Sequence, residues 1–287
     1  MYITRDDRQY FEIKDVVISS NNKQYEIIDR LGAGGNAVVY SCLNSDGDEL
    51  AIKFLLNVYD KSLRRFRQEV NTLRGIQHPN LIQYVDEGTT VAKVPKNEKG
   101  KQEILFVVME KADCNLREYL KNRGKIKYSE YAPQFIGLSE ALKALHEKVI
   151  HRDLKLENIL VIGERWVISD LGLCCYINDE EHEEITTLHE KIGPKYWMSP
   201  EAINKIYNEV DQIVPASDVF QLVAIFWFAV TNRYPLGNVS IEDWGESNKG
   251  MCKVLLKGLQ HDNLKRQQNG CELHREILEI IREHGGI

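Results

Sequence analysis

Apolar residues change their spacing near Met109, and this change limits the folds open to the chain. Before it, short segments rich in β-branched and aromatic residues alternate with Gly, Asn and Asp turn signals, which is typical of strands. After it, apolar residues recur three or four positions apart, the spacing of amphipathic helices. The sequence therefore predicts an α+β protein in which a small β-rich part precedes a larger, mostly helical part.

The same patterns predict the main elements. In the first part we expect a helix over 63–73 and strands at 25–31, 38–43, 50–56, 82–85 and 104–109. The polar segment KVPKNEKGKQ before the last strand predicts an exposed hairpin tip. In the second part we expect a hairpin formed by 159–162 and 166–169, and helices over 116–121, 131–146 and 219–230. The two parts would meet near Glu110–Asp113, and ligand sites favour such interdomain positions.

Composition narrows the class of protein. The 287 residues are 43% hydrophobic, which suffices for one large or two modest cores. A net charge of −6 argues against a nucleic-acid surface. Six Cys without a CxxC pair favour a reducing, intracellular and cytoplasmic location. The charged N-terminus is unlike a signal peptide, and the apolar run Val219–Val230 is too short to span a membrane.

LGAGGNAVVY lies between two predicted strands. Gly32 and Gly34 would let the backbone approach an anion, with N–H groups facing phosphate. A flexible hairpin is the alternative. A dinucleotide fingerprint is disfavoured because the glycines are followed by a predicted strand and not by a helix.

Charged residues in the next two segments suggest an ion pair. Lys53 ends the strand segment AIK, and a Lys in a mostly apolar strand needs a partner if it is buried. Glu69 on the following helix is the natural candidate. The alternative is that both are ordinary solvated charges.

HRDLKLEN, residues 151–158, meets the needs of phosphoryl transfer. Asp153 can accept a proton from an attacking hydroxyl, and Lys155 can neutralise charge on the moving group. Asn158 can offer its carbonyl oxygen to Mg²⁺, and Asp170, after the strand segment VIS, can add a carboxylate oxygen. The alternative is a charged turn before a strand.

Taken together, these motifs resemble those of a eukaryotic-type protein kinase catalytic domain. GAGGNA, AIK, Glu69, HPN, VVMEKAD, HRDLKLEN, DLG, SPE and SDVFQL occur in the family's order, from about Tyr25 to about Ile281. The resemblance implies a bilobal fold with an N-terminal extension at 1–24, a β-rich N-lobe at 25–110 and a larger helical C-lobe at 111–287.

The resemblance also implies roles by position. Asp153 would be the catalytic base, Lys53 would hold the ATP phosphates and pair with Glu69, and Asn158 and Asp170 would bind Mg²⁺. Met109 would be the gatekeeper, and the backbone of Glu110 and Ala112 would bind the adenine edge. The residues implied to bind ATP are Leu31, Gly32, Gly34, Val39, Ala51, Lys53, Met109, Glu110, Ala112, Asn115 and Leu160.

Two further roles follow from the same resemblance. Glu201 would pair with Arg266, and Asp218 would brace the catalytic loop from the 219–230 helix. Ala37 and Leu171 depart from the family pattern without removing a charge needed for transfer.

Two signals that bear on the kind of substrate point in opposite directions. Lys155 favours serine/threonine specificity, whereas Pro194 and Trp197 resemble the substrate segment of tyrosine kinases. We therefore expect an ATP- and Mg²⁺-dependent kinase of protein hydroxyls, Ser/Thr favoured. Tyrosine or dual specificity, a nucleotide-binding pseudokinase and a small-molecule phosphotransferase are the alternatives. The partners would be protein substrates, and the oligomeric state is left open.

The segment from Asp170 to Glu201 is acidic and suggests a mode of regulation. Glu190 lies where many family members carry a phosphorylated Thr that pairs with the Arg of HRD, here Arg152. A carboxylate there would supply part of a phosphate's charge permanently. Phosphorylation of Thr186 or Thr187 is the rival hypothesis.

Overall fold

The computed structural model describes residues 1–5, 8–34, 36–57, 59–93, 100–177, 196–206, 211–246 and 248–283. The chain forms two compact units. The sheet unit comprises Met1–Gly75 and Ile82–Ala112, and the helical unit comprises Ile76–Leu81 and Asp113–Ile287. The predicted α+β class, with strands before helices, is confirmed.

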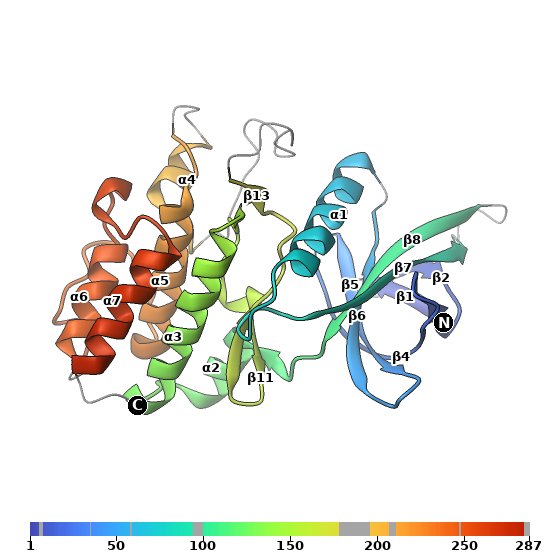
Figure 1. Ribbon diagram of the computed structural model, residues 1–287, viewed down its shortest axis with the longest axis horizontal. Coiled ribbons are helices and arrows are strands. Elements are labelled where there is room, and N and C mark those ends of the chain that lie inside the picture. The colour runs from blue at the N-terminus through green and yellow to red at the C-terminus, as the bar shows by residue number, and fades with distance from the viewer. Residues whose placement is uncertain are drawn as a thin grey trace. The chain divides into compact units, whose positions relative to one another are not determined.

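The sheet unit is built on one antiparallel sheet in the order β1-β2-β7-β8-β6-β5-β4-β3 (Figure 1). Its strands are β1 (Tyr2–Arg5), β2 (Arg8–Glu12), β3 (Val16–Ile18), β4 (Gln24–Ala33), β5 (Ala37–Asn44), β6 (Glu49–Leu55), β7 (Tyr84–Lys93) and β8 (Lys101–Glu110). All five predicted strands are present. The fourth begins and ends later than expected, because β7 pairs with β8 along its whole length.

The first 24 residues, predicted to form an N-terminal extension, contribute the three strands β1, β2 and β3 to this sheet. Ile3, Phe11 and Val17 from these strands are buried in one core with Phe54 and Phe106. The signal in the sequence was weak because each strand is short. Burial of apolar side chains on one face explains why the segment joins the sheet.

Helix α1 (Asp60–Gly75) packs beside the sheet (Figure 1). Phe66, Val70 and Leu73 are spaced along one stripe and are buried. This is the 3.6-residue periodicity that predicted the helix. Glu69 lies on the same buried stripe, so the helix carries a carboxylate into the interior of the unit.

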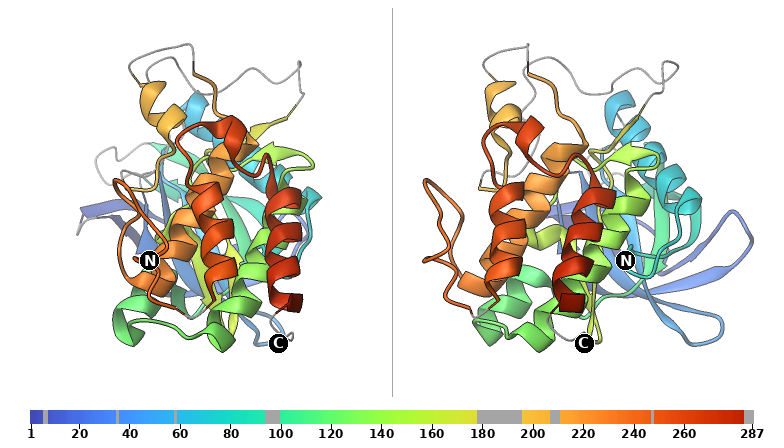
Figure 2. Two further views of the ribbon diagram at one scale, coloured as in Figure 1. Left: turned by 90° about the vertical axis from the view of Figure 1, so that its left-hand side faces the viewer. Right: turned by 60° about the vertical axis from the view of Figure 1, so that its left-hand side comes forward.

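Helices dominate the second unit. They are α2 (Leu116–Arg123), α3 (Tyr128–Leu145), α4 (Pro200–Asn204), α5 (Pro215–Thr231), α6 (Lys249–Gly258) and α7 (Gly270–Glu283). Figures 1 and 2 show α3, α5, α6 and α7 side by side. The predicted helix over the apolar run is α5, and nearly all of its residues are buried. Among the described residues, no helix is both long and apolar enough to cross a lipid bilayer.

Short strands and single helical turns complete this unit. The predicted hairpin is formed by β11 (Ile159–Ile162) and β12 (Arg165–Ile168), and β9 (Cys114–Asn115) pairs with β11. The strands β10 (Val149–Ile150) and β13 (Cys175–Tyr176) pair with each other. The 3₁₀ turns are η1 (Leu156–Asn158) and η2 (Asn263–Lys265). Residues 151–158 therefore lie between β10 and β11, held at both ends by strand pairing.

Candidate active site

The predicted site residues fall in both units, and the sheet register arranges those of the sheet unit. Val39 of β5, Lys53 of β6 and Val107 of β8 are cross-strand partners in one row. Ala51 and Met109 are partners in the next row, two residues along. Residues two apart in a strand point to the same face. Val39, Ala51, Lys53 and Met109 therefore share one face of the sheet, as a common ligand would require.

Lys53 and Glu69 form a largely buried ion pair. The Nζ of Lys53 donates to Oε1 of Glu69 at 2.6 Å, and the two side chains are 14% and 4% exposed. The pairing expected from the sequence is thus present. The pair joins α1 to β6. Separating its partners would leave an uncompensated buried charge, so the pair favours one position of α1 on β6.

The β4–β5 hairpin carries Gly32 and Gly34, and Gly34 N–H donates to Ala37 O at 2.8 Å. Neither glycine has a positive φ, and a Cβ built on either would meet nothing within 4 Å. Neither turn geometry nor packing within the chain therefore requires glycine here. Open space beside the backbone fits a loop that a ligand approaches closely. Leu31, 46% exposed, precedes this loop.

The end of β8 offers backbone groups. Met109 is buried, and Glu110 N–H donates to Gln83 O at 3.0 Å. Among the described residues, the N–H of Ala112 has no hydrogen-bond partner. A donor left open at this position fits the adenine-binding role predicted for Ala112.

Two predicted ATP-binding residues belong to the helical unit and are cross-strand partners. Leu160 of β11 lies opposite Asn115 of β9. The Oδ1 of Asn115 accepts from Glu118 N at 3.1 Å and caps α2. The capping bond uses only Oδ1. Among the described residues Nδ2 of Asn115 has no hydrogen-bond partner, so it can donate to a ligand.

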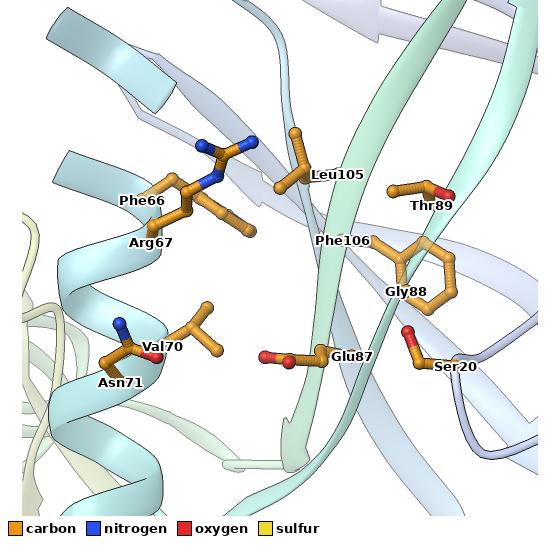
Figure 3. Close-up of a pocket in the computed structure, with 10 residues that line it drawn as sticks. All are labelled: Ser20, Phe66, Arg67, Val70, Asn71, Glu87, Gly88, Thr89, Leu105 and Phe106. Atoms are coloured by element: carbon orange, nitrogen blue, oxygen red, sulfur yellow. The ribbon is translucent and has the colours of Figure 1, made fainter. Parts of the chain in front are cut away.

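A separate hollow of about 300 Å³ lies between α1 and strands β7 and β8 (Figure 3). None of the site residues predicted from the sequence lines it. Its lining residues are Ser20, Phe66, Arg67, Val70, Asn71, Glu87, Gly88, Thr89, Leu105 and Phe106. The hollow is therefore lined by residues other than those predicted to bind ATP, although Leu105 shares a sheet face with Val107 and Lys53.

In the helical unit, residues 151–158 bring three predicted groups together. Lys155 Nζ lies 2.6 Å from Oδ2 of Asp153. The Nδ2 of Asn158 donates to the same Oδ2 at 3.0 Å and to the backbone oxygen of Asp153 at 2.8 Å. Because Nδ2 makes both contacts, Oδ1 of Asn158 is the atom left for a cation. Asp153 is thus oriented by a cation and an amide.

His151 links this loop to the segment that carries Asp170. Its Nδ1 accepts from Asp153 N at 3.2 Å, so the proton of a neutral ring lies on Nε2. Nε2 then donates to Ser169 O at 3.0 Å. The Oγ of Ser169 also donates to Asn158 O at 2.9 Å. Asp170 is therefore positioned by the residues that position Asp153.

The backbone is strained at two places in this site. Arg152 has φ +71° and Asp170 has φ +61°, a left-handed conformation that few residues other than glycine adopt. Such strain persists only where the surroundings impose it and is concentrated at functional sites.

Asp218 of α5 supplies much of that constraint, as the resemblance implied. Its carboxylate is fully buried and accepts from the N–H groups of His151 at 2.6 Å and Arg152 at 2.8 Å. Burial alone would raise the pKa of Asp218, but hydrogen bonds, led by that from His146, keep the pKa below its ordinary value. Asp218 is therefore an anion that holds the loop.

Two bracing residues were missed in the sequence. His146 Nδ1 accepts from Gly270 N at 2.9 Å, so Nε2 donates to Asp218 at 3.0 Å. Gln221 Oε1 accepts from Leu154 N at 2.9 Å, and its Nε2 donates to Arg152 O at 3.3 Å. A lone amide in the apolar run 219–230 was the available signal for Gln221. His146 had none, because its partners are distant in the sequence.

The electrostatic setting of Asp153 differs from that of Asp218. Burial raises the pKa of Asp153 above its ordinary value, and the nearby charge of Asp170 raises it further. The charge and hydrogen bond of Lys155 act in the opposite direction. A carboxylate with a raised pKa is a better proton acceptor, which suits a general base.

Glu201 and Arg266 form the second pair that the resemblance implied. Arg266 Nη1 and Nη2 donate to the two carboxylate oxygens of Glu201 at 2.8 and 2.9 Å. Its remaining donors go to backbone oxygens of Ala216, His261 and Gln260. All five guanidinium N–H groups are thus satisfied while the side chain is 0% exposed.

One of the predicted regulatory residues lies within the described ranges. Arg152 is described, and it is buried. Thr186, Thr187, Glu190 and Pro194 lie outside the described residues.

Comparisons with known proteins complete the description. The protein kinase domain family matches residues 25–283. A probable receptor-like protein kinase of Arabidopsis thaliana is 30% identical over 238 residues, 79% of this chain and 45% of the relative. A probable serine/threonine-protein kinase of Dictyostelium discoideum, fhkD, is 29% identical over 282 residues, 90% of this chain and 35% of the relative.

The dual specificity protein kinase TTK of Mus musculus is 24% identical over 235 residues, 77% of this chain and 26% of the relative. This chain therefore spans less than half the length of each of these three relatives.

Proposed function

This chain belongs to the protein kinase domain family, and on that premise we propose that it transfers the γ-phosphoryl group of ATP to hydroxyl groups of proteins. The observation that carries the proposal is the set of contacts around Asp153. Its carboxylate is held by Lys155 and Asn158, and its pKa is raised. A positioned carboxylate beside a cation is what proton acceptance from a substrate hydroxyl requires.

The residues present fit Mg²⁺ and ATP. Asn158 Oδ1 and the Asp170 carboxylate are oxygen donors, the kind that Mg²⁺ prefers. When bound, the ion would neutralise charge on the phosphates. Lys53, held by Glu69, would contact the phosphates, and the open backbone at Gly32 and Gly34 would approach them. The remaining work of this chain is to position groups and supply charge.

We propose serine and threonine as the preferred acceptors. Lys155 supports this preference, because serine/threonine kinases carry a Lys at this position of the loop. Its Nζ lies 2.6 Å from Oδ2 of Asp153. The names of two relatives bear on specificity, one being a probable serine/threonine-protein kinase and the other a dual specificity protein kinase. Phosphoamino-acid analysis of autophosphorylated protein distinguishes Ser, Thr and Tyr.

Catalysis is tested with Asp153→Asn, using Asp46→Asn in an exposed turn as the matched control. The variant is expected to bind ATP normally and to lose turnover by a factor on the order of 10² or more, because the base is gone. Its folding should be intact. The raised pKa of Asp153 means that its ionised form destabilises the folded state at pH values above that pKa, and Asn carries no such charge. The measurements are phosphate transfer to a generic protein substrate with Mg²⁺-ATP, ATP affinity and the melting temperature.

Near-normal turnover in Asp153→Asn would overturn the assignment of the base. If the wild-type protein binds ATP without transferring phosphate to any substrate, a nucleotide-binding pseudokinase is the function. Phosphorylation of small molecules but not of proteins would indicate the small-molecule phosphotransferase.

Regulation and location are further parts of the proposal. Glu190 would act as a permanent anion for Arg152, in which case phosphatase treatment leaves activity intact and Glu190→Ala lowers it about as much as Arg152→Ala. Loss of activity on phosphatase treatment, with Glu190→Ala harmless, would instead point to Thr186 or Thr187.

An intracellular location is supported by the six cysteines, all within the described ranges and all free.

A further inference from the structure

Gln221 of α5 contacts both peptide groups that flank Asp153. Its Oε1 accepts from the N–H of Leu154 at 2.9 Å, and its Nε2 donates to the carbonyl oxygen of Arg152 at 3.3 Å. The side chain of Gln221 is buried, so water does not compete for either bond. The amide therefore bridges from the peptide group before Asp153 to the peptide group after it.

This bridge needs the chemistry of a carboxamide. One of its ends must accept a hydrogen bond and the other must donate one, and a carboxamide offers both in one plane. Asp218 lies three residues earlier, on the same face of α5. It meets a different need, because its two carboxylate oxygens accept from the N–H groups of His151 and Arg152. Each polar side chain of this helix face thus matches the backbone groups that it contacts.

The two bonds help to fix the direction of the Asp153 side chain. A residue has two soft backbone dihedrals, and both are set once the peptide groups on its two sides are held. The other groups of these peptides are held as well. Asp153 N–H donates to Nδ1 of His151 at 3.2 Å, and Asp153 O accepts from Asn158 at 2.8 Å. Among the described residues, Gln221 is the one side chain that is hydrogen-bonded to both peptides.

The residue before Asp153 is strained and needs such support. Arg152 has φ +71°, a conformation that relaxes unless its surroundings impose it. Its N–H is held by Asp218 and its carbonyl oxygen by Gln221. Without the bond from Gln221, the peptide group between Arg152 and Asp153 is free to rotate, and the Asp153 carboxylate turns with it.

We propose that Gln221 is a positioning residue for phosphoryl transfer, which acts through the backbone to aim the carboxylate of Asp153 at the substrate hydroxyl. The inference rests on the proposed function. A displacement of about 1 Å at a reacting group can cost on the order of 10²-fold in rate. Gln221 makes no hydrogen bond to a described residue that is predicted to bind ATP. Its loss should therefore slow the transfer step and leave nucleotide binding unchanged.

Gln221→Met tests the proposal, because it removes both hydrogen bonds and nearly conserves the volume of the side chain. Its kcat per folded molecule is expected to fall by about 10-fold to 100-fold. The KM for ATP and the ATP affinity should stay within about twofold of the wild-type values. The measurements are initial rates with Mg²⁺-ATP and a generic protein substrate, ATP affinity, and circular dichroism to determine the folded fraction.

Val223→Ala is the matched control for damage to the same helix. Val223 is buried in α5 beside Gly258 of α6 and makes no contact with residues 151–154 that a hydrogen bond would record. This variant should have a lower melting temperature and the wild-type kcat per folded molecule. A role of Gln221 in stability alone would give Gln221→Met the same behaviour.

Gln221→Glu separates the bridge from the packing of the side chain. When neutral, the new carboxyl group can accept from Leu154 N–H through one oxygen and donate its own O–H to Arg152 O. Burial and the nearby Asp218 carboxylate raise the pKa of this group, and its ionisation removes the donor as the pH rises. Relative to wild type, kcat should be within about threefold at pH 6 and should fall toward pH 9. Gln24→Glu, at an exposed position of β4, should keep the wild-type profile.

The outcomes separate this inference from the proposed function. Near-normal kcat in folded Gln221→Met would overturn the positioning role, and so would a loss of ATP affinity as large as the loss of kcat. If Gln221→Met does not fold, Gln221→Glu decides, and a kcat ratio as low at pH 6 as at pH 9 would overturn the role. If the wild-type protein transfers no phosphate, the proposed function has failed and the inference fails with it.

Discussion

At the scale of single residues, the structure gives two buried aspartates opposite properties. Asp218 accepts three N–H donors and has a lowered pKa, whereas Asp153 is buried with fewer donors and has a raised pKa. Burial disfavours the charged form of both, and hydrogen bonds decide the difference. One carboxylate is thereby suited to structural support and the other to proton transfer.

Lys155→Ala tests the origin of the pKa of Asp153. The charge of Lys155 lowers that pKa, so its removal should raise the pKa further. Because Asp153 must be ionised to accept a proton, the acid limb of the kcat profile should move to higher pH. Turnover at its optimum should also fall, on the order of 10²-fold, through lost charge stabilisation. The measurement is kcat from pH 5 to pH 9.

Lys253→Ala, at an exposed position on α6, is the control for a lost positive charge and should keep the wild-type profile. An acid limb that stays in place, or moves to lower pH, in Lys155→Ala would contradict the electrostatic account.

At the scale of elements, buried polar side chains hold helices together across long sequence distances. Glu201 lies in the first turn of α4 and Arg266 follows η2, and Ser217 of α5 donates to Glu201 at 2.6 Å. Burial alone would raise the pKa of Glu201, but the hydrogen bonds from Arg266 and Ser217 lower it. The cluster therefore joins three elements through one ionised carboxylate.

Arg266→Lys should destabilise the protein although the charge is kept. An ammonium has three donors and cannot reproduce the five contacts of the planar guanidinium, so buried acceptors lose their partners. We expect the free energy of unfolding to fall by about 3 kcal/mol, as when a buried pair is broken. The measurement is urea denaturation followed by circular dichroism.

Arg275→Lys, at an exposed position of α7, is the matched control and should change stability by less than about 0.5 kcal/mol. Equal stability of the two variants would show that the geometry around Arg266 contributes little.

At the scale of the whole molecule, each compact unit contains a buried thiol that reports on its unfolding. Cys42 lies in the core of the sheet unit and Cys252 in α6 of the helical unit, and both are 0% exposed. Burial raises the pKa of Cys42 to about 12 and that of Cys252 to about 11. Cys271, by contrast, is exposed.

Alkylation at pH 8 should therefore modify Cys271 rapidly and the two buried thiols only on unfolding. Buried thiols have few thiolates and no access, so their modification should be slower by at least about 10³-fold. Peptide mass spectrometry of a time course measures each site, and fully denatured protein gives the control rates. Native modification of Cys252 at the rate of Cys271 would mean that α6 opens readily.

The sequence by itself determined the two-part α+β organisation, because the periodicity of apolar residues is a local property of each element. It also pointed to Lys53, Glu69, Asp153 and Asn158, since phosphoryl transfer would need those residue types at those spacings.

Only the tertiary structure decided what supports them. The bracing of residues 151–154 by His146, Asp218 and Gln221 joins residues up to 72 apart in sequence. Arg117 donates both to Glu157 and to the hydroxyl of Tyr234, which is 117 residues away in sequence. No local pattern encodes such contacts, because each depends on which helix faces are packed together. The same reason explains why β1, β2 and β3 were not predicted. Each strand is short, and only the tertiary structure shows that their apolar side chains join the core of the sheet.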